Sequence, residues 1–360
     1  MTTLIVYHQG CADGSFAAAI TALACHNDTV HFYPAVYAQD QGDIVTADGV
    51  LLQDIPGLEG IKDANGKFIE DPKGYTRVVV VDFSLTESQM AIFTQRFGGN
   101  FKVLDHHNVR SHELYAEECA KLDVSPLSLT FASGGSGALL AYMDHVSDFQ
   151  QHNFEFTDNI IRIAQLVSDR DLWIRSNARA FAFYEGYQSS VFSTVEKCGY
   201  IYTDVPPTVD AALAIIREGD IEQIIAQGFE NIEARNEVIR GLIRDNSVFA
   251  KPNSLVPVRH AVVPCDKSIA SETGSYVYEN YPDFQTVLLV RKGHRDPSRV
   301  YVSCRSNGYT ENVPGCARHT AQQRGGEGHI NAAGFNVSLD EFNQLYPGLQ
   351  LDFDSVGCDC

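Results

Sequence analysis

Four consecutive valines at residues 78–81 constrain the fold of this chain more than any other feature. The surrounding segment RVVVVDFS, residues 77–84, predicts a strand, because β-branched side chains favour extended backbone. An unbroken apolar strand is typical of one covered on both faces, as the strands of parallel sheets are. The sequence therefore predicts an α/β protein built on a parallel sheet.

The segments around this strand alternate between strand and helix patterns. Short apolar runs at residues 3–8, 31–37 and 101–107 each predict a strand. Residues 13–26 and 84–97 have apolar residues at helical spacing and predict helices, the second capped by Ser84 or Thr86. This alternation indicates an open parallel sheet. Residues 39–75 are less regular and predict an insertion, with a turn at DANGK, residues 63–67.

Aspartate and histidine side chains fall at or just beyond the carboxyl ends of these predicted strands. They are His8, Asp13, Asp82, Asp105, His106 and His107. Each alone is more often a cap or turn residue than a ligand, but an open α/β sheet binds its ligands outside these strand ends. Carboxylate and imidazole together suit Mn²⁺, Fe or Zn²⁺, and two ions can share one carboxylate. Asp82 is the predicted shared carboxylate, because it ends the strand that reads as most buried.

The rest of the chain predicts a helical middle and a second region of short strands. Residues 156–174 predict a helix that ends in Asp169 and Asp171, and residues 209–246 predict a connecting helix or helix pair. Short strands follow from about residue 256, and the glycine cluster RGGEGHINAAGF closes this region at residues 324–335.

Length and charge limit the kinds of protein this can be. A chain of 360 residues suits two domains, and its net charge of −19 disfavours binding to long nucleic acid. No apolar run is long enough to span a membrane, and no signal peptide is recognisable. Nine scattered cysteines predict reduced thiols and a cytoplasmic protein. The terminal CDC, Cys358 and Cys360, could bind a metal, but a tail is the preferred interpretation.

Five motifs, in order along the chain, resemble those of the DHH phosphoesterases of the DHH–DHHA1 branch. HQGCADGSFAAA, VVVDFS, LDHHNV and VSDRDLW resemble four motifs of the catalytic domain, and GHINAAGF, preceded by VSCRSN, resembles the glycine–histidine motif of DHHA1. The resemblance spans His8 to Phe335, although residues 175–260 match only in general character. It implies a Rossmann-like DHH domain at 1–205, a helical connector at 206–254 and a smaller α/β DHHA1 domain at 255–360.

The resemblance also implies roles for individual residues. It implies two divalent ions, manganese first, with magnesium, iron or zinc as alternatives. The implied ligands are His8 and Asp82 for one ion, and Asp13, Asp82, His106 and Asp169 for the other. His107 would contact the scissile phosphate, and Asp105 would orient an imidazole. Arg305, Gly328 and His329 would bind the substrate.

The implied activity is hydrolysis of phosphodiester or phosphomonoester bonds in small nucleotides. The candidate substrates are short oligonucleotides, cyclic or linear dinucleotides, and 3′,5′-bisphosphates. Two alternatives remain open: a polyphosphate or pyrophosphate hydrolase, and a nucleotide sensor with weak catalysis. The expected partners include no long nucleic acid and no membrane, and a homodimer is left open.

The sequence departs from the family pattern at Cys11, where many relatives carry an aspartate. A thiolate ligand there would favour zinc or iron. Alternatively, Cys11 is a small packed residue and water completes the ion; this second interpretation is preferred. The DRD segment is also ambiguous: Asp169 is the preferred ligand by motif position, while Asp171 and Trp173 are expected only to pack.

Overall fold

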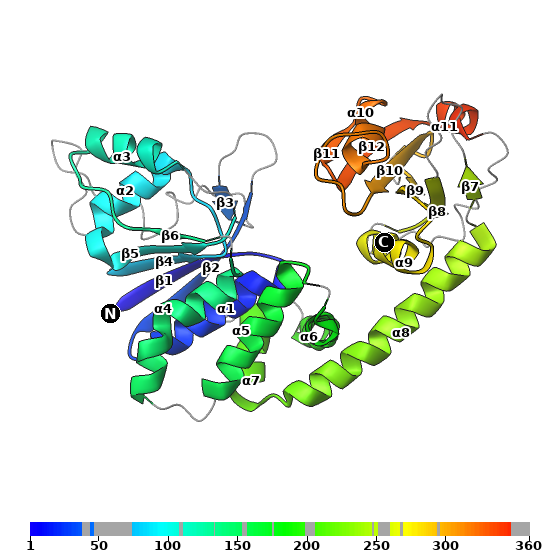
Figure 1. Cartoon of the computed structure of the whole chain (residues 1–360). Coiled ribbons are helices and arrows are strands. Elements are labelled where there is room, and N and C mark those ends of the chain that lie inside the picture. Colours follow the sequence, from blue (N-terminus) through cyan, green and yellow to red (C-terminus); the bar gives the residue numbers. More distant parts are fainter. Residues whose placement is uncertain are drawn as a thin grey trace. The chain divides into compact units, whose positions relative to one another are not determined.

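The computed structural model divides the chain into two compact units, Met1–Ile232 and Glu233–Cys360. Each is described by itself (Figure 1). The structure describes residues 1–37, 44–46, 74–107, 111–132, 134–152, 157–174, 176–198, 206–246, 248–250, 260–266, 269–293 and 296–346. The predicted turn at residues 63–67 and the terminal CDC lie outside these ranges.

The first unit contains the predicted parallel sheet. Its strands are β1 (Thr2–His8), β2 (Thr29–Tyr37), β3 (Ile44–Thr46), β4 (Arg77–Val81), β5 (Phe101–Asp105) and β6 (Thr130–Phe131). They lie in the order β3-β2-β1-β4-β5-β6. All neighbouring pairs are parallel except β2 and β3, so the segment that follows β2 adds an antiparallel edge strand. The prediction of an α/β fold with a parallel sheet is confirmed.

The valines of β4 face two separate apolar cores, as expected for a strand covered on both faces. Val79 and Val81 pack in the core that contains residues of α1 (Ala12–Ala24), α4 (Gly137–His152), α5 (Thr157–Asp171), α6 (Ala178–Cys198) and α7 (Pro207–Glu218). Val78 and Val80 pack against α2 (Glu87–Phe97) and α3 (His112–Lys121). Figure 1 shows α2 and α3 on one face of the sheet, and α1 and α4 on the other.

Of the two caps predicted for the helix after β4, Ser84 and Thr86, the structure has Thr86. Its hydroxyl accepts a hydrogen bond from the backbone N–H of Gln89, whose side chain accepts from the N–H of Thr86. This capping box stabilises the first turn of α2 and ends the loop that follows β4.

The strand order reverses at β1, which has β2 on one side and β4 on the other. Where the order of a parallel sheet reverses, the connections leave in opposite directions and open a crevice at the carboxyl ends of the two strands. In this sheet the crevice lies beyond the ends of β1 and β4, which is where the predicted metal ligands are.

The second unit is a mixed sheet with helices on both faces. The later residues of the helix α8 (Ile221–Asn246) belong to this unit, which begins at Glu233. The helices α7 and α8 are the predicted helix pair. Its strands are β7 (Val248–Ala250), β8 (His260–Pro264), β9 (Thr286–Lys292), β10 (Arg299–Arg305), β11 (Glu327–His329) and β12 (Ala332–Ser338), in the order β11-β12-β10-β9-β8-β7. Only β8 and β9 are parallel among these strands.

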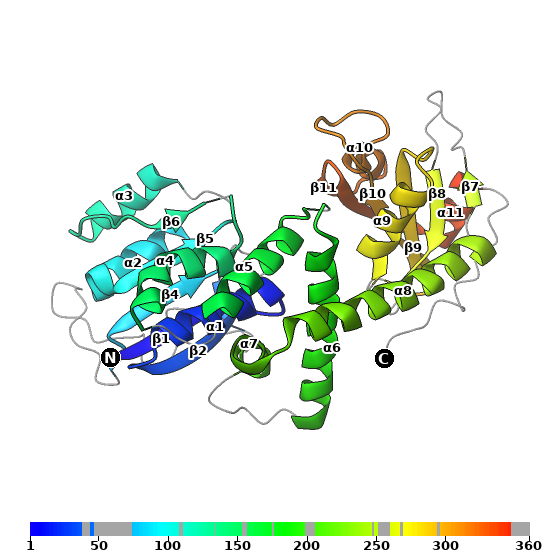
Figure 2. The same cartoon turned by 60° about the horizontal axis from the view of Figure 1, so that its bottom comes forward.

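Two cores hold the second unit together. On one face, α10 (Ala317–Gln322) and α11 (Leu339–Leu345) pack with β10 and β12. On the other face, α9 (Ala270–Asn280) and the end of α8 pack on β8 and β9 (Figure 2). In neither unit does a described helix have the combined length and hydropathy that a membrane span requires.

Candidate metal centre

The ends of three parallel strands bring the predicted ligands to one edge of the first sheet. His8 is the last residue of β1, Asp82 directly follows β4, and Asp105 ends β5. His106 and His107 follow Asp105 in the chain. Since these strands are parallel and adjacent, their carboxyl ends lie together, and side chains far apart in sequence meet there.

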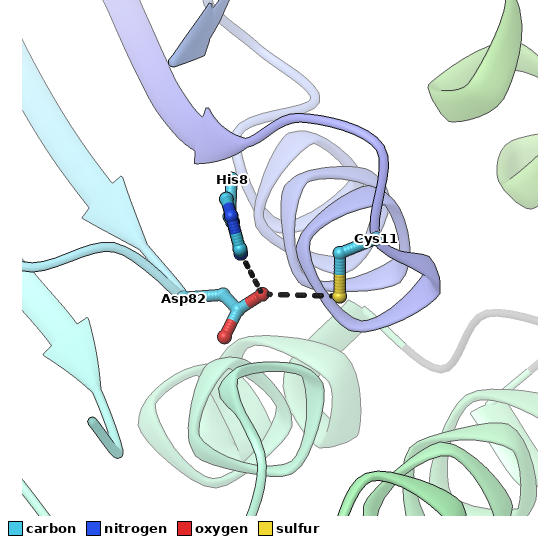
Figure 3. A group of neighbouring side chains, drawn as sticks. All are labelled: His8, Cys11 and Asp82. Carbon is cyan, nitrogen blue, oxygen red and sulfur yellow. Dashed lines mark hydrogen bonds and ion pairs between the residues drawn. The ribbon is translucent and has the colours of Figure 1, made fainter. Parts of the chain in front are cut away.

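Asp82 is at the centre of this cluster, and its two carboxylate oxygens face different neighbours. Oδ2 lies 3.8 Å from Nδ1 of His8 and 3.6 Å from Sγ of Cys11 (Figure 3). Oδ1 lies 3.1 Å from Nε2 of His106 and 3.7 Å from Nδ1 of His107. The residue is 1% exposed. A carboxylate with a separate set of ligand atoms at each oxygen has the arrangement needed to bridge two ions.

The backbone of Asp82 is held in an unusual conformation by the start of α4. Its φ is +53°, a left-handed value that costs a non-glycine residue about 1–3 kcal/mol. Gly137, the first residue of α4, approaches so closely that a Cβ there would lie 2.5 Å from Cβ of Asp82. A glycine at position 137 is therefore required for Asp82 to keep this position, a role that the glycine-rich sequence did not reveal.

The Gly137→Ala variant is expected to lose about 1–3 kcal/mol of unfolding free energy, because the new methyl group overpacks against the backbone of Asp82. Its manganese affinity should fall as Asp82 is displaced. Gly134→Ala is the matched control, since a Cβ there meets no atom within 4 Å. Denaturant unfolding and manganese titration measure both effects. Wild-type stability and affinity in Gly137→Ala would show that the close approach is not needed.

Asp13 is oriented by the same helix. Its buried carboxylate accepts hydrogen bonds from the backbone N–H groups of Gly137, at 2.6 Å, and Ala138, at 2.8 Å. These first amides of α4 favour a negative charge. Burial, together with the charges of Asp82 and Asp171, nevertheless raises the pKa of Asp13 well above its usual value. A bound cation would relieve this repulsion between carboxylates.

His106 lies among three carboxylates. Its Nε2 is 3.1 Å from Oδ1 of Asp82, 3.4 Å from Oδ2 of Asp171 and 3.5 Å from Oδ2 of Asp13. Burial disfavours the imidazolium, but the hydrogen bond to Asp82 and the charges of the other two carboxylates raise the pKa of His106 to about 9. A proton on His106 thus offsets negative charge, and a metal ion would replace it, because a ligand imidazole must be neutral.

The structure places Asp171, and not Asp169, beside the predicted ligands. Asp171 forms a group with Asp13 and His106 whose ligand atoms lie within 4.8 Å of one another. The Asp169 carboxylate instead accepts a hydrogen bond from Nδ2 of Asn177, at 2.6 Å. Residues two apart on a helix point to different faces, so α5 can turn only one of these aspartates toward His106. Here the structure differs from the prediction made by motif position.

Replacement of each aspartate by asparagine tests this difference. Asp171→Asn is expected to lower the affinity for one manganese ion by at least about tenfold, since it removes a carboxylate from the group around His106. Asp169→Asn should leave both ions bound as in the wild type, because the amide oxygen of the new asparagine can still accept a hydrogen bond from Asn177. Manganese binding isotherms of the two variants, compared with wild type, are the measurement. The opposite order of effects would restore Asp169 as the ligand.

His107 is fixed by the buried carboxylate of Asp105. Asp105 accepts hydrogen bonds from the hydroxyl of Ser84, from the backbone N–H of His107 and, at 2.8 Å, from Nδ1 of the His107 ring. The hydrogen bond to Asp105 is the main reason that the pKa of His107 is raised. Such a bond orients the ring and sets which nitrogen carries the proton. The geometry also groups His107 with Asp82 and His106 as possible ligands.

A cavity of about 180 Å³ adjoins the cluster on the side of Cys11 and Asp171. Aromatic residues of α6 form part of its wall, including Phe183, Tyr184 and Tyr187. Arg170 also lines it, with its guanidinium 4.5 Å from the ring centre of Tyr184. The aromatic residues of α6 belong to no motif that marks them as part of a site, so this wall was not predicted.

The predicted substrate residues of the second unit lie at neighbouring positions of its sheet. Arg305 ends β10 and pairs with Ala332 of β12, which in turn pairs with His329 of β11. Gly328 has a φ of +139°, and a Cβ there would lie 2.5 Å from Cα of Ala333. Glycine is therefore required at position 328 for the close packing of β11 on β12.

The donor atoms of the first unit fit two divalent ions. His8, Cys11 and Asp82 form one group of potential ligands, and Asp13, His106 and Asp171 form another. Within each group the ligand atoms lie within 4.8 Å of one another. Asp82 contacts members of both groups. Buried carboxylates beside imidazoles are the donor set of divalent metal sites.

Comparison with known proteins supports the fold. No protein-family model and no curated protein matches the sequence. Among solved structures, the pGpG-specific phosphodiesterase PggH from Vibrio cholerae matches with a TM-score of 0.50 and 11% identity, over 99% of this chain and 100% of that one. Exonuclease RecJ bound to manganese matches with a TM-score of 0.45 and 15% identity, over 96% and 88% of the two chains. Along essentially its whole length, the chain has the fold of the phosphodiesterase PggH.

Proposed function

We propose that this chain is a two-metal phosphoesterase that hydrolyses small nucleotides. The observation that carries the proposal is the position of Asp82, whose two oxygens face separate groups of potential ligands. In the proposed site, His8 and Asp82 hold one ion. Asp13, Asp82, His106 and Asp171 hold the other, with Asp171 in the place first predicted for Asp169.

In the proposed site, some residues of the cluster hold the ions and His107 contacts the substrate. Two divalent ions at such a site would lower the pKa of a bound water and offset the charge of phosphoryl oxygens. Around them, Asp13 is held by the amides of α4, and Asp82 is fixed by Gly137. His107, oriented by Asp105, donates a hydrogen bond to a phosphoryl oxygen, where charge increases during hydrolysis.

The net charge of the protein is the reason for proposing small substrates. A net charge of −19 repels long polyanions, which need many cationic contacts to bind. Basic residues outnumber acidic ones in one segment of the second unit, residues 291–324, which contains seven Lys or Arg and two Asp or Glu. We assign substrate contacts to Arg305, Gly328 and His329 of that unit. Since PggH shares the fold and is pGpG-specific, a linear dinucleotide is the first substrate to test.

The test is a substrate screen with chelator-treated protein reconstituted with manganese. The panel is pGpG, pApA, the 3′,5′-bisphosphate pAp, cyclic dinucleotides, a long single strand and polyphosphate. We expect manganese-dependent release of mononucleotide or phosphate from at least one small nucleotide, and little from the long strand. Turnover of polyphosphate alone would instead make the protein a polyphosphate hydrolase. Tight nucleotide binding with no turnover of any substrate would make it a sensor.

A further inference from the structure

Cys11 occupies the turn between β1 and α1, and its side chain points into the metal centre. It is the N-cap residue of α1, with extended backbone, but its side chain makes no capping hydrogen bond. Instead, Sγ lies 3.6 Å from Oδ2 of Asp82, on the same side as His8 (Figure 3). A thiol packed only among apolar side chains would not lie beside a buried carboxylate.

Comparison with a packed cysteine of the same unit shows the difference. Cys119 of α3 is fully buried in the apolar core formed with α2, where it contributes to packing. Cys11 belongs to none of the apolar cores of the described residues, and it is only partly buried. Its cavity is also lined by Asp13, Arg170 and Asp171. The surroundings of Cys11 therefore combine the aromatic wall of α6 with charged groups, which the core around Cys119 does not offer.

We propose that Sγ of Cys11 is a ligand of the ion on the His8 side of Asp82, so that the two ions occupy sites of different chemistry. This inference rests on the two-metal function proposed above. The His8 site then offers sulfur, nitrogen and oxygen, a set that selects zinc or iron. The site formed by Asp13, His106 and Asp171 offers only nitrogen and oxygen, a set compatible with manganese. The interpretation of Cys11 as a packed residue is replaced by this one.

Binding of a metal ion by Cys11 would release one proton. The S–H bond would break, a sulfur–metal bond would form, and the proton would pass to solvent. No electron is transferred, so the step needs no oxidant or reductant. The consequence for the protein is selective loading, in which zinc or iron enters the His8 site and manganese enters the other.

The test is cobalt titration of the chelator-treated full-length protein, because cobalt bound to a thiolate gives a charge-transfer absorption in the near ultraviolet. All samples carry serine at Cys358 and Cys360, because these two closely spaced thiols could also bind cobalt. We expect the absorption to saturate at about one cobalt per chain. It should be absent from Cys11→Ser and Cys11→Asp. It should persist in Cys25→Ser, the matched control, since Cys25 caps the opposite end of α1.

Competition between metals gives a second readout that does not depend on activity. Cys11→Asp replaces a soft ligand with a hard one, so the ratio of zinc to manganese affinity at the His8 site should fall by at least about tenfold. X-ray absorption of the zinc-loaded protein with Cys11 intact should show a sulfur neighbour at about 2.3 Å, which needs no Cys11 variant to fold.

The outcomes separate this inference from the proposed function. Two bound ions with no thiolate absorption and no sulfur neighbour would overturn the role of Cys11 and leave the two-metal proposal standing. The absence of any tightly bound ion would overturn both. A thiolate absorption that is unchanged in Cys11→Ser would assign the sulfur to another cysteine and overturn the inference.

Discussion

Asp82→Asn is expected to lower metal-dependent hydrolysis by roughly a thousandfold, the largest effect of any single substitution in the centre. The bridging carboxylate contacts both ligand groups, so its loss affects both ions at once. Asparagine offers one oxygen in place of two, and it turns an N–H₂ group toward either the His8 side or the His106 side. The ions stabilise the transition state by several kcal/mol, and losing that stabilisation lowers the rate roughly a thousandfold.

The measurements for Asp82→Asn are kcat on the best substrate of the screen and metal content after manganese reconstitution. Asp144→Asn is the control, because it makes the same change in an aspartate of α4 that pairs with Lys102 on the surface. Control and wild type should be alike. Near-normal turnover in Asp82→Asn would remove Asp82 from the reaction and, with it, the proposed arrangement of the site.

His107→Ala should lower kcat by about a hundredfold to a thousandfold while two metal ions remain bound. This is the size of effect seen when one donor to a developing oxyanion is removed. The expectation follows from the ring geometry, since Nδ1 of His107 is held 2.8 Å from the Asp105 carboxylate. That bond fixes the orientation of the imidazole, and in the proposed site the ring would donate to a phosphoryl oxygen without binding an ion.

Metal content decides between the two roles that the geometry allows for His107. If His107 were a ligand, His107→Ala would lose one ion together with activity. His112→Ala is the control, because His112 is an exposed histidine of α3 that lies outside the cluster. Asp105→Asn should reproduce part of the kcat loss with both ions retained, since Asp105 belongs to none of the ligand groups and its contact with the cluster is through His107.

The sheet and the edge that carries the site could be predicted because they follow from local patterns. The four valines indicated a strand covered on both faces, and alternate valines do enter two different cores. Once the sheet was parallel, the ends of its strands had to lie on one edge, so His8, Asp82 and Asp105 could be brought together from sequence alone. The cap of α2 could be narrowed to Ser84 or Thr86, since capping depends on residues three positions apart, and the structure has Thr86.

Other parts of the centre depend on contacts that the sequence does not encode locally. Whether Asp169 or Asp171 faces His106 depends on the rotation of α5, and motif position alone gave the other choice. Gly137 matters because α4 approaches Asp82 from a distant part of the chain. The direction of the Cys11 side chain, at an N-cap, follows no periodic pattern. Each of these is a tertiary contact.

The central claim, that two divalent ions share the carboxylate of Asp82, is tested most directly by anomalous diffraction from crystals grown with manganese and zinc. We expect two metal peaks about 3.5–4 Å apart, one beside His8 and Cys11 and the other beside Asp13, His106 and Asp171. Asp82 should lie between the peaks with one oxygen toward each. A single peak, or two peaks of which neither contacts Asp82, would show that the ions do not share this carboxylate.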